Sequence, residues 1–392
     1  MKYCIIGAGV IGNAIAREIS NRKLGEVIVL EKESESAIHA SGRNSGVIHS
    51  GINQKPGTKK AELCLEGSKM LRDYCQEKKI SMEECGTLVV ALTEKERAKL
   101  KLMQEMALQI GVPGVRIISG EELREREPSA NGLEALLSPT GAIVDARAVV
   151  KSLQKDAESN GAEYKFNTQV TDINRRTIIT SNGEITADFI INCAGLHADK
   201  IAHMAGAGRE YSMLPFRGEY VKIPAHIESM IYQVPDMRFP FLGVHLTKHI
   251  DGSVLAGPTA TLSFGGREDY EKSQGLQGVP EFLRQKGFIK WAARTALTPA
   301  SLKQLIYNLR LSNSREVLAN EIDKIYDGHI NPEDMEAHPA GIRAQLISSD
   351  GRLVNDFHIE TMPGSVHILN AVSPGFTASL AFANYIAANY IK

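Results

Sequence analysis

A glycine fingerprint near the start of the chain constrains the fold more than any other feature. Residues 2–6 form a short apolar run, and Gly7, Gly9 and Gly12 follow in the spacing G-x-G-x-x-G. Apolar residues then recur at helical spacing, and a second apolar run ends at Glu31, nineteen residues after Gly12. In such a strand–turn–helix unit the glycines admit a pyrophosphate and the acid accepts hydrogen bonds from a ribose. We expect a dinucleotide-binding unit; the alternative is a tight turn that binds nothing.

The segment that follows distinguishes between two dinucleotides. In a nicotinamide-dependent dehydrogenase, the strand ending at Glu31 leads into further strand–helix alternation. Here residues 39–51 read HASGRNSGVIHSG, a stretch rich in glycine and serine. Such a backbone can lie flat along a large cofactor and donate N–H groups to its phosphates and ring edge. The sequence therefore favours FAD over NAD.

The remaining patterns predict two interleaved domains. The 392 residues exceed the usual size of one compact core. We assign 1–80, 145–210 and 335–392, with their strand–helix alternation, to an FAD-binding domain, and 81–144 and 211–334 to a substrate-binding domain. The expected fold class is α/β, mixed with α+β. A Rossmann-like FAD-binding domain is interleaved with a substrate domain built on a mostly antiparallel sheet with helices.

Two local signals set element boundaries. Asp251 and Gly252 predict a hairpin turn between strands. Near the C-terminus, a helix is expected over 374–390, with Ser373 as its cap and Pro374 as its first residue.

Charge and cysteine content exclude several classes of function. The net charge of −1 provides no overall field for nucleic acid. The five cysteines show no C-x-x-C spacing, so we expect free thiols, no disulfide framework and no metal site. A strand pattern begins at Lys2 and no run of 18 apolar residues occurs. We therefore expect a cytoplasmic protein.

Blocks along nearly the whole chain carry a family resemblance. Besides the loop at 39–51, they are KPGTKKAELC (55–64), PFRGEY (215–220), VPDMRFPFLGVHLT (234–247), DGSVLAGP (251–258), AGIRAQ (340–345) and DGRLVNDF (350–357). In this order they resemble the L-2-hydroxyglutarate dehydrogenase/oxidase family. That family is a branch of the FAD-dependent D-amino-acid-oxidase-like superfamily, which includes glycerol-3-phosphate dehydrogenase.

The resemblance implies an FAD enzyme that oxidises a 2-hydroxy acid, most specifically L-2-hydroxyglutarate to 2-oxoglutarate. Hydride passes to the flavin, and an external acceptor, which is oxygen, a quinone or another carrier, reoxidises it. The alternatives are oxidation of glycerol 3-phosphate or of an amino acid on the same fold, and a non-catalytic nucleotide-binding sensor. Two segments depart from the family: Arg43 replaces its usual histidine, and SPGFTAS (373–379) replaces SPAATSS. Both are expected near the flavin, so acceptor or substrate preference can differ.

Three arginines are candidates for binding the substrate carboxylates. Arg343, in AGIRAQ, corresponds to the arginine that the wider superfamily uses to bind the carboxylate or phosphate of its substrate. A dicarboxylate needs a second anchor, for which Arg217 and Arg238 compete. Either of these can instead form an ion pair, with Glu219 or Asp236, that holds the sheet. Tyr220 is a further candidate for substrate contact.

His49 and His245 are the candidates for the base that removes the hydroxyl proton. A strand over 241–247 would place His245 and Thr247 on the face opposite Leu246. His49 follows the glycine-rich loop and resembles the histidine near the ring in glycerol-3-phosphate enzymes. A neutral imidazole suits proton removal, although either residue can be a hydrogen-bonded core histidine.

The predicted cofactor contacts lie in short segments spread along the chain. The terminal helix is expected to direct its positive end at the flavin edge that gains negative charge on reduction. The residues are Gly7, Gly9, Val10, Ile11, Gly12, Glu31, Lys32, Ser41, Arg43, Asn44, Ser45, Gly46, Val47, His49, Val170, Cys193, Ala194, Gly195, Gly341, Arg343, Gly375, Phe376 and Thr377.

A basic stretch raises the question of a membrane partner. Residues 282–310 contain six basic residues, no acidic ones, and Trp291. They are compatible with peripheral contact with the anionic inner face of a membrane, where a quinone is reached. We favour the alternative, helices that cover the substrate domain, because Pro299 interrupts the pattern.

Overall fold

The computed structural model describes residues 1–236 and 242–391. Its first sheet contains the predicted dinucleotide unit. In spatial order its strands are β20 (His358–Met362), β21 (Ser365–Asn370), β13 (Phe189–Asn192), β1 (Lys2–Ile6), β2 (Glu26–Leu30) and β9 (Glu163–Lys165). Neighbouring strands are parallel except in the β20–β21 hairpin. The glycine fingerprint therefore lies at the carboxyl end of a central parallel strand, where such sheets bind their ligands.

Both faces of this sheet are covered because its strands are apolar on both sides. Helices α1 (Val10–Asn21), α5 (Ala146–Ser159), α11 (Ser379–Tyr390) and α2 (Lys59–Lys78) group on one side, where Tyr3 and Ile5 of β1 point. The alternate residues Cys4 and Ile6 point to the other side. That side is covered by α6 (Ala198–Met204) and the small sheet of β10 (Val170–Asn174), β11 (Thr177–Thr180) and β12 (Gly183–Thr186). This two-sided burial is typical of a parallel sheet.

A second, larger sheet is mostly antiparallel. Its spatial order is β18 (Thr261–Leu262), β14 (Tyr211–Ile223), β17 (Val254–Gly257), β16 (His245–Lys248), β15 (Met230–Gln233), β5 (Thr87–Ala91), β7 (Glu134–Ser138) and β6 (Arg116–Ser119). Strand β19 (Glu336–Ser348) also pairs with β14, from Tyr211 opposite Ser348 to Lys222 opposite Glu336. Only β15 and β5 form a parallel pair among the described strands of this sheet. The predicted turn at Asp251 and Gly252 joins β16 to β17, which confirms that hairpin.

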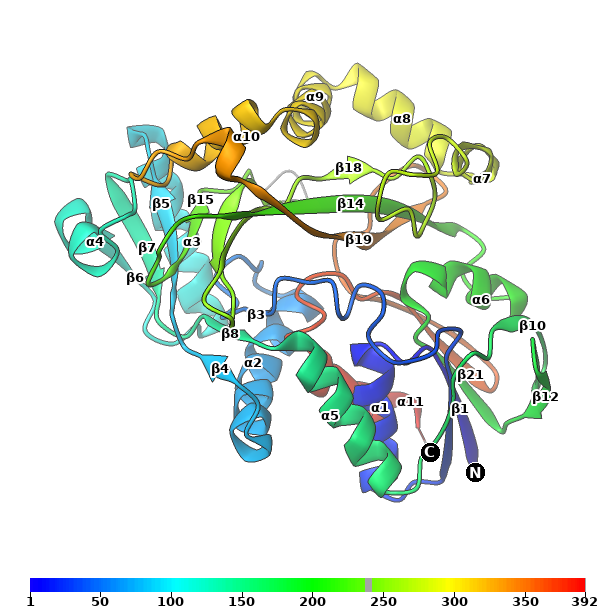
Figure 1. Ribbon diagram of the computed structural model, residues 1–392. Helices are drawn as coiled ribbons and strands as arrows, with labels where there is room; N and C mark the ends of the chain where they lie inside the picture. The colour runs from blue at the N-terminus through cyan, green and yellow to red at the C-terminus, as the bar shows by residue number, and fades with distance from the viewer. Residues whose placement is uncertain (237–241, 392) are drawn as a thin grey trace.

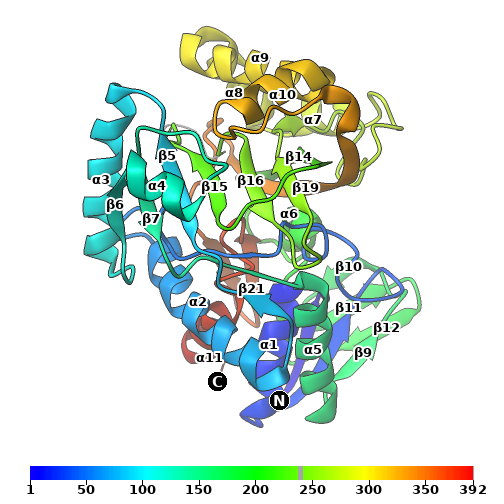
Figure 2. The same cartoon turned by 60° about the vertical axis from the view of Figure 1, so that its left-hand side comes forward.

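Helices cover the side of the large sheet that faces away from the nucleotide unit. Figure 1 shows α8 (Phe288–Leu297), α9 (Pro299–Asn313) and α10 (Arg315–Asp323) above β14, and Figure 2 shows them at the same end of the molecule. The short α7 (Val279–Arg284) precedes them. The remaining elements are α3 (Glu94–Ile110), α4 (Gly120–Arg126), η1 (Gly195–His197), η2 (Pro332–Asp334), and the small sheet of β3 (Val47–Ile48), β8 (Ala142–Val144) and β4 (Met82–Glu83).

The structure confirms the predicted fold class, a parallel nucleotide-type sheet combined with a mostly antiparallel one. All strands of the parallel sheet come from the ranges assigned to the FAD-binding domain. Strand β19 also comes from the range 335–392, but it pairs with β14 of the large sheet. The division of the chain into domains at the predicted boundaries remains a prediction.

The start of the terminal helix was predicted wrongly. Helix α11 begins at Ser379, and Ala378 occupies the N-cap in place of Ser373. Residues 374–378 form turns, in which Gly375 N–H donates to Val372 O at 3.0 Å and Ala378 N–H donates to Pro374 O at 2.9 Å. The hydroxyl of Thr377 also bonds to β3, since it accepts from His49 N–H at 3.0 Å and lies 3.3 Å from Val47 O. These tertiary contacts hold the segment out of the helix.

Candidate active site

A cavity of about 680 Å³ lies between the two sheets. Ile6 and Leu30, at the carboxyl ends of β1 and β2, line one side of it. Phe216, Gly218 and Tyr220 of β14 line the opposite side. The cavity therefore joins the nucleotide-type unit to the inner face of the antiparallel sheet, as a site for a cofactor and a substrate requires.

Most predicted site residues line this cavity. They are Gly7, Gly9, Val10, Ile11, Glu31, Lys32, Ser41, Arg43, Asn44, Ser45, Val47, His49, Val170, Cys193, Ala194, Gly195, Tyr220, His245, Gly341, Arg343, Gly375, Phe376 and Thr377.

The glycine turn fits a dinucleotide phosphate. Gly7 has a φ of +106°, and a Cβ there would lie 2.6 Å from the carbonyl oxygen of Cys193. Helix α1 has no acidic residue in its first turn, and its N-cap Gly9 has no capping side chain. Its N-terminus is thus compatible with an anion. The carboxylate of Glu31 is held by the backbone N–H groups of Ala8, at 2.8 Å, and Glu33, at 3.0 Å. These residues match what the diphosphate and ribose of FAD require.

The glycine-rich loop is held in place by its own side chains. Asn44 accepts from Gly46 N–H at 2.8 Å and donates to Ser41 O at 2.7 Å. Arg43 donates to the carbonyl oxygens of Ile38 and Ala340, both at 3.1 Å, and lies over the ring of Tyr270 at 4.0 Å. The arginine that departs from the family pattern therefore ties this loop to the large sheet and to the loop that carries Tyr270.

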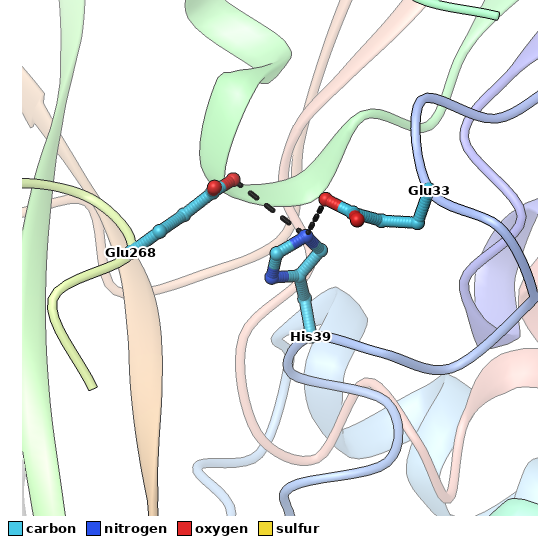
Figure 3. Close-up of side chains that lie close together, drawn as sticks. All are labelled: Glu33, His39 and Glu268. Atoms are coloured by element: carbon cyan, nitrogen blue, oxygen red, sulfur yellow. Dashed lines mark hydrogen bonds and ion pairs between the residues drawn. The ribbon is translucent and has the colours of Figure 1, made fainter. Parts of the chain in front are cut away.

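A charged cluster lies at the cavity wall next to this loop. Figure 3 shows Glu33 and Glu268 directed at His39, whose Nε2 is 2.9 Å and 3.6 Å from their carboxylates. Although two acids and a histidine can bind a metal, the ammonium of Lys32 pairs with both carboxylates, at 2.8 Å from Glu268. Burial favours a higher pKa for Glu268, but hydrogen bonds from His197 and Lys32 outweigh it and lower the pKa to about 2. The cluster thus carries its own cation and links the N-terminal loop to the loop before α7.

Arg343 and the two candidate histidines line the same cavity. Arg343 lies on β19, donates from Nε to Gln345 Oε1 at 3.2 Å, and has its pKa lowered by burial to about 10. It remains a cation at neutral pH. Burial lowers the pKa of His49 to about 4, and the imidazole therefore stays neutral. Its Nε2 is 3.5 Å from the hydroxyl of Ser373.

The tautomer of His245 follows from its hydrogen bond. Its Nδ1 lies 2.9 Å from the carbonyl oxygen of Gly243, and because a carbonyl only accepts, Nδ1 carries the proton. Nε2 is then an unprotonated acceptor. The ring stacks on Tyr232, with centroids 4.2 Å apart. Burial lowers the pKa of His245 to about 4, against the opposing effect of the Gly243 bond and with a smaller lowering contribution from the neighbouring His49.

The sequence prediction missed Lys60, which also lines the cavity. It lies in the first turn of α2, and the residue is 8% exposed. A signal was present in the sequence: Lys60 precedes Cys64, Gly67 and Leu71 on the buried face of this helix, at spacings of four, seven and eleven residues. A lysine on an apolar face requires an explanation, because lysine is rarely buried without a partner.

Three predicted residues do not line the cavity. Arg217 is corrected: it forms an ion pair with Glu219, the alternative weighed above. Phe216, Gly218 and Tyr220 of β14 line the cavity, whereas Arg217 does not, and its partner Glu219 accepts a hydrogen bond from Ser312 of α9. Gly12 and Gly46 serve backbone packing, since added Cβ atoms would lie 2.0 Å from Gly7 O and 2.4 Å from Val144 O. Arg238 lies outside the described residues.

Sequence comparisons find matches over nearly the whole chain. The family model for FAD-dependent oxidoreductases matches residues 2–389. The mitochondrial L-2-hydroxyglutarate dehydrogenase of Homo sapiens is 36% identical, over 98% of this chain and 87% of that protein. The L-2-hydroxyglutarate dehydrogenase of Escherichia coli K12 is 34% identical over 98% and 92%, and that of Indibacter alkaliphilus is 37% identical over 97% and 96%.

Solved structures agree on the fold. The dithionite-reduced L-α-glycerophosphate oxidase of Mycoplasma pneumoniae with FAD bound has a TM-score of 0.74 and 26% identity, covering 98% of this chain and 92% of that one. Glycine oxidase from Geobacillus kaustophilus has a TM-score of 0.72 and 19% identity, covering 98% and 93%. The second likeness concerns the fold alone.

Proposed function

Because this chain belongs to the family of FAD-dependent oxidoreductases, we propose that it oxidises L-2-hydroxyglutarate to 2-oxoglutarate. Relatives with 34–37% identity over nearly the whole chain bear the name of that dehydrogenase. The observation that carries the proposal is one cavity that contains the glycine fingerprint, the buried cation Arg343 and two histidines held neutral.

The cofactor is FAD, and we propose as its contacts the predicted cofactor-binding residues that line the cavity. The turn at Gly7, with the N-terminus of α1, would face the diphosphate, and Glu31 would accept from the ribose. The loop through Asn44 and the turn at Gly375 would lie along the ring. FAD, when bound, supplies the acceptor for the hydride that leaves the hydroxyl-bearing carbon.

Two residues have proposed roles on the substrate. Arg343 binds the carboxylate next to the hydroxyl-bearing carbon, since its planar guanidinium offers paired donors. His245 accepts the hydroxyl proton at Nε2, leaving the oxygen to form the new carbonyl. We favour His245 over His49 because the bond from Nδ1 to Gly243 O fixes the tautomer that a base requires. His49, which also lines the cavity, is proposed to contact the flavin ring.

Anaerobic reduction of the bound flavin tests this function. We expect L-2-hydroxyglutarate to bleach the yellow protein and its D isomer to leave it coloured. If only glycerol 3-phosphate or an amino acid bleaches the flavin, the proposed substrate is wrong and the corresponding alternative activity on the same fold is correct. A flavin that none of these substrates reduces would favour the nucleotide-binding sensor.

The electron acceptor and the location belong to the same proposal. We keep oxygen, a quinone and another carrier as candidate acceptors. Reducing the flavin with substrate and then comparing its rate of reoxidation by each acceptor separates them.

Among the helices of the described residues, none combines the length and the apolar character that a membrane span requires. The cysteines are free, in keeping with the cytoplasmic location that we propose.

Peripheral contact with the inner membrane face is proposed from the surface of α8 and α9. Helix α8 has no buried residue, and Ile289 and Leu297 are 61% and 83% exposed. On α9, Leu302, Ile306 and Leu309 are exposed at one-turn spacing. The same two helices carry four exposed basic residues, Lys290, Arg294, Lys303 and Arg310, which suit an anionic lipid surface. Trp291 does not belong to this surface, because it packs on Phe216 with ring centroids 5.9 Å apart.

A further inference from the structure

Lys60 is a buried cation on the wall of the cavity. The proposed function gives it no role. The first turn of α2 places it on the face that packs inward, while its end borders the cavity. Removing an ammonium from water is costly unless a partner compensates. A buried lysine beside a ligand cavity therefore calls for an anion.

Among the residues that the structure describes, no group supplies that anion as a direct contact. Within the described residues, Lys60 Nζ has neither a hydrogen bond nor an ion pair, and the ring of Phe357 lies at 5.9 Å. The nearby carboxylate of Asp356 accepts instead from the backbone N–H groups of Lys59 and Lys60, both at 2.9 Å. The other charged or titratable groups that act on Lys60 are Arg343 and the thiol of Cys64.

The pKa of Lys60 is consistent with a buried ammonium that lacks an adjacent anion. Burial, followed by the positive charge of Arg343, lowers the pKa of Lys60 to about 7, against the smaller opposing effect of Asp356. Two cations from distant parts of the chain thus border one cavity, within electrostatic range of each other.

We propose that Lys60 binds the substrate carboxylate remote from the oxidised carbon, so that the site selects dicarboxylic 2-hydroxy acids. This inference rests on the proposed function, with Arg343 holding the carboxylate beside the hydroxyl. A monocarboxylic substrate would leave the Lys60 ammonium buried against an apolar chain end. That penalty discriminates between substrates more strongly than a missing attractive contact would.

The neighbouring Lys59 offers a matched control. It lies on the same turn of α2, but its ammonium pairs with Glu62 at 3.0 Å on the exposed side and lies over the ring of Tyr385 at 4.6 Å. Neutralising Lys59 removes the same charge from the same helix end without reaching the cavity.

The test compares two substrates of equal chain length. L-2-hydroxyvalerate has a methyl group where L-2-hydroxyglutarate has its remote carboxylate. In Lys60→Met, we expect the ratio of kcat/KM for L-2-hydroxyglutarate to that for L-2-hydroxyvalerate to fall on the order of 10- to 100-fold. The Lys59→Met variant is expected to keep the wild-type ratio. A Lys60→Met variant with an unchanged ratio, or with both substrates impaired equally, would overturn the proposal.

Binding without turnover provides a second readout. Calorimetry on the FAD-loaded protein with glutarate should show tighter binding to wild type than to Lys60→Met, and proton uptake above pH 7 in wild type alone. Lys60→Arg keeps the charge and should retain the preference for dicarboxylates; its loss would count against the proposal. If wild type binds glutarate through Lys60 but L-2-hydroxyglutarate does not reduce the flavin, the proposed function fails while this inference stands.

Discussion

His245 Nδ1 donates to the carbonyl oxygen of Gly243 at 2.9 Å, two residues earlier on the approach to β16. This bond fixes the position of the proton on the ring and leaves Nε2 as the basic nitrogen. Because burial keeps the imidazole neutral, the base is ready at neutral pH without first losing a proton.

Replacing the base should slow catalysis without displacing the cofactor. We expect His245→Asn to lower kcat by about 100- to 10,000-fold, the range for a positioned general base. The FAD content should stay at the wild-type level. His226→Asn, a change at an exposed histidine paired with Glu228, is the control and should change neither quantity. If His49→Asn loses this activity and His245→Asn keeps it, the two roles are reversed.

Substrate binding should depend on the paired donors of the Arg343 guanidinium and not only on its charge. Arg343→Lys keeps the charge but loses the paired donors, so we expect kcat/KM for L-2-hydroxyglutarate to fall about 10- to 100-fold. Steady-state kinetics with Arg294→Lys, on the exposed side of α8, provides the comparison. An Arg343→Lys enzyme as efficient as wild type would remove Arg343 from the carboxylate site.

Acid should destabilise the protein before its carboxylates titrate. Burial lowers the pKa of His49, His245 and His367 to about 4, from 6.5. Between these values the unfolded chain binds protons that the folded protein does not, so stability falls as the pH falls from 6.5 towards 4. Thermal unfolding at a series of pH values should show a decreasing Tm over this window. If the Tm stays level or rises between pH 6.5 and 4, burial of these histidines does not cause the acid destabilisation.

The glycine turn should tolerate no side chain at Gly7. Gly7→Ala places a Cβ 2.6 Å from Cys193 O, and we expect loss of bound FAD or of folded protein. Gly161→Ala is the matched control, because Gly161 also has a positive φ, +93°, but a Cβ there meets nothing within 4 Å. That variant should lose only about 1 kcal/mol of stability and keep its FAD. Flavin absorbance of the purified proteins measures the difference, and normal FAD content in Gly7→Ala would refute the packing argument.

The surface of α8 and α9 should bind anionic vesicles. Sedimentation with phosphatidylglycerol vesicles should recover wild type, and the double variant Ile289→Ser, Leu297→Ser should bind less. Leu108→Ser, at a residue of α3 that is 58% exposed, is the control for lost apolar surface elsewhere. Equal binding by all three proteins, or binding by none, would contradict membrane contact through these helices.

Local sequence patterns predicted much of the nucleotide unit, but not every boundary or face. The strand, the glycines and Glu31 lie close together in the sequence, so their spacing already specifies their geometry. The start of α11 was misplaced because Ser373 and Pro374 satisfy the local rule for a helix start, whereas contacts of Thr377 with β3 hold this segment in turns. Arg217 was misplaced because alternation along a strand separates two faces without telling which one borders the cavity.

The sequence by itself determined three things: a cofactor-binding βαβ unit, the family of the protein, and the arginines and histidines that are candidates for its chemistry. These depend on short-range spacing and on blocks that resemble known proteins. Only the tertiary structure decided which side chains meet at the cavity. Lys60 and Arg343 come from a helix near one end of the chain and a strand near the other, and they share a cavity only once both sheets have formed. The burial that sets the charge of Lys60, His49 and His245 arises from the same packing. Such burial is a property of the surrounding residues and not of any one segment.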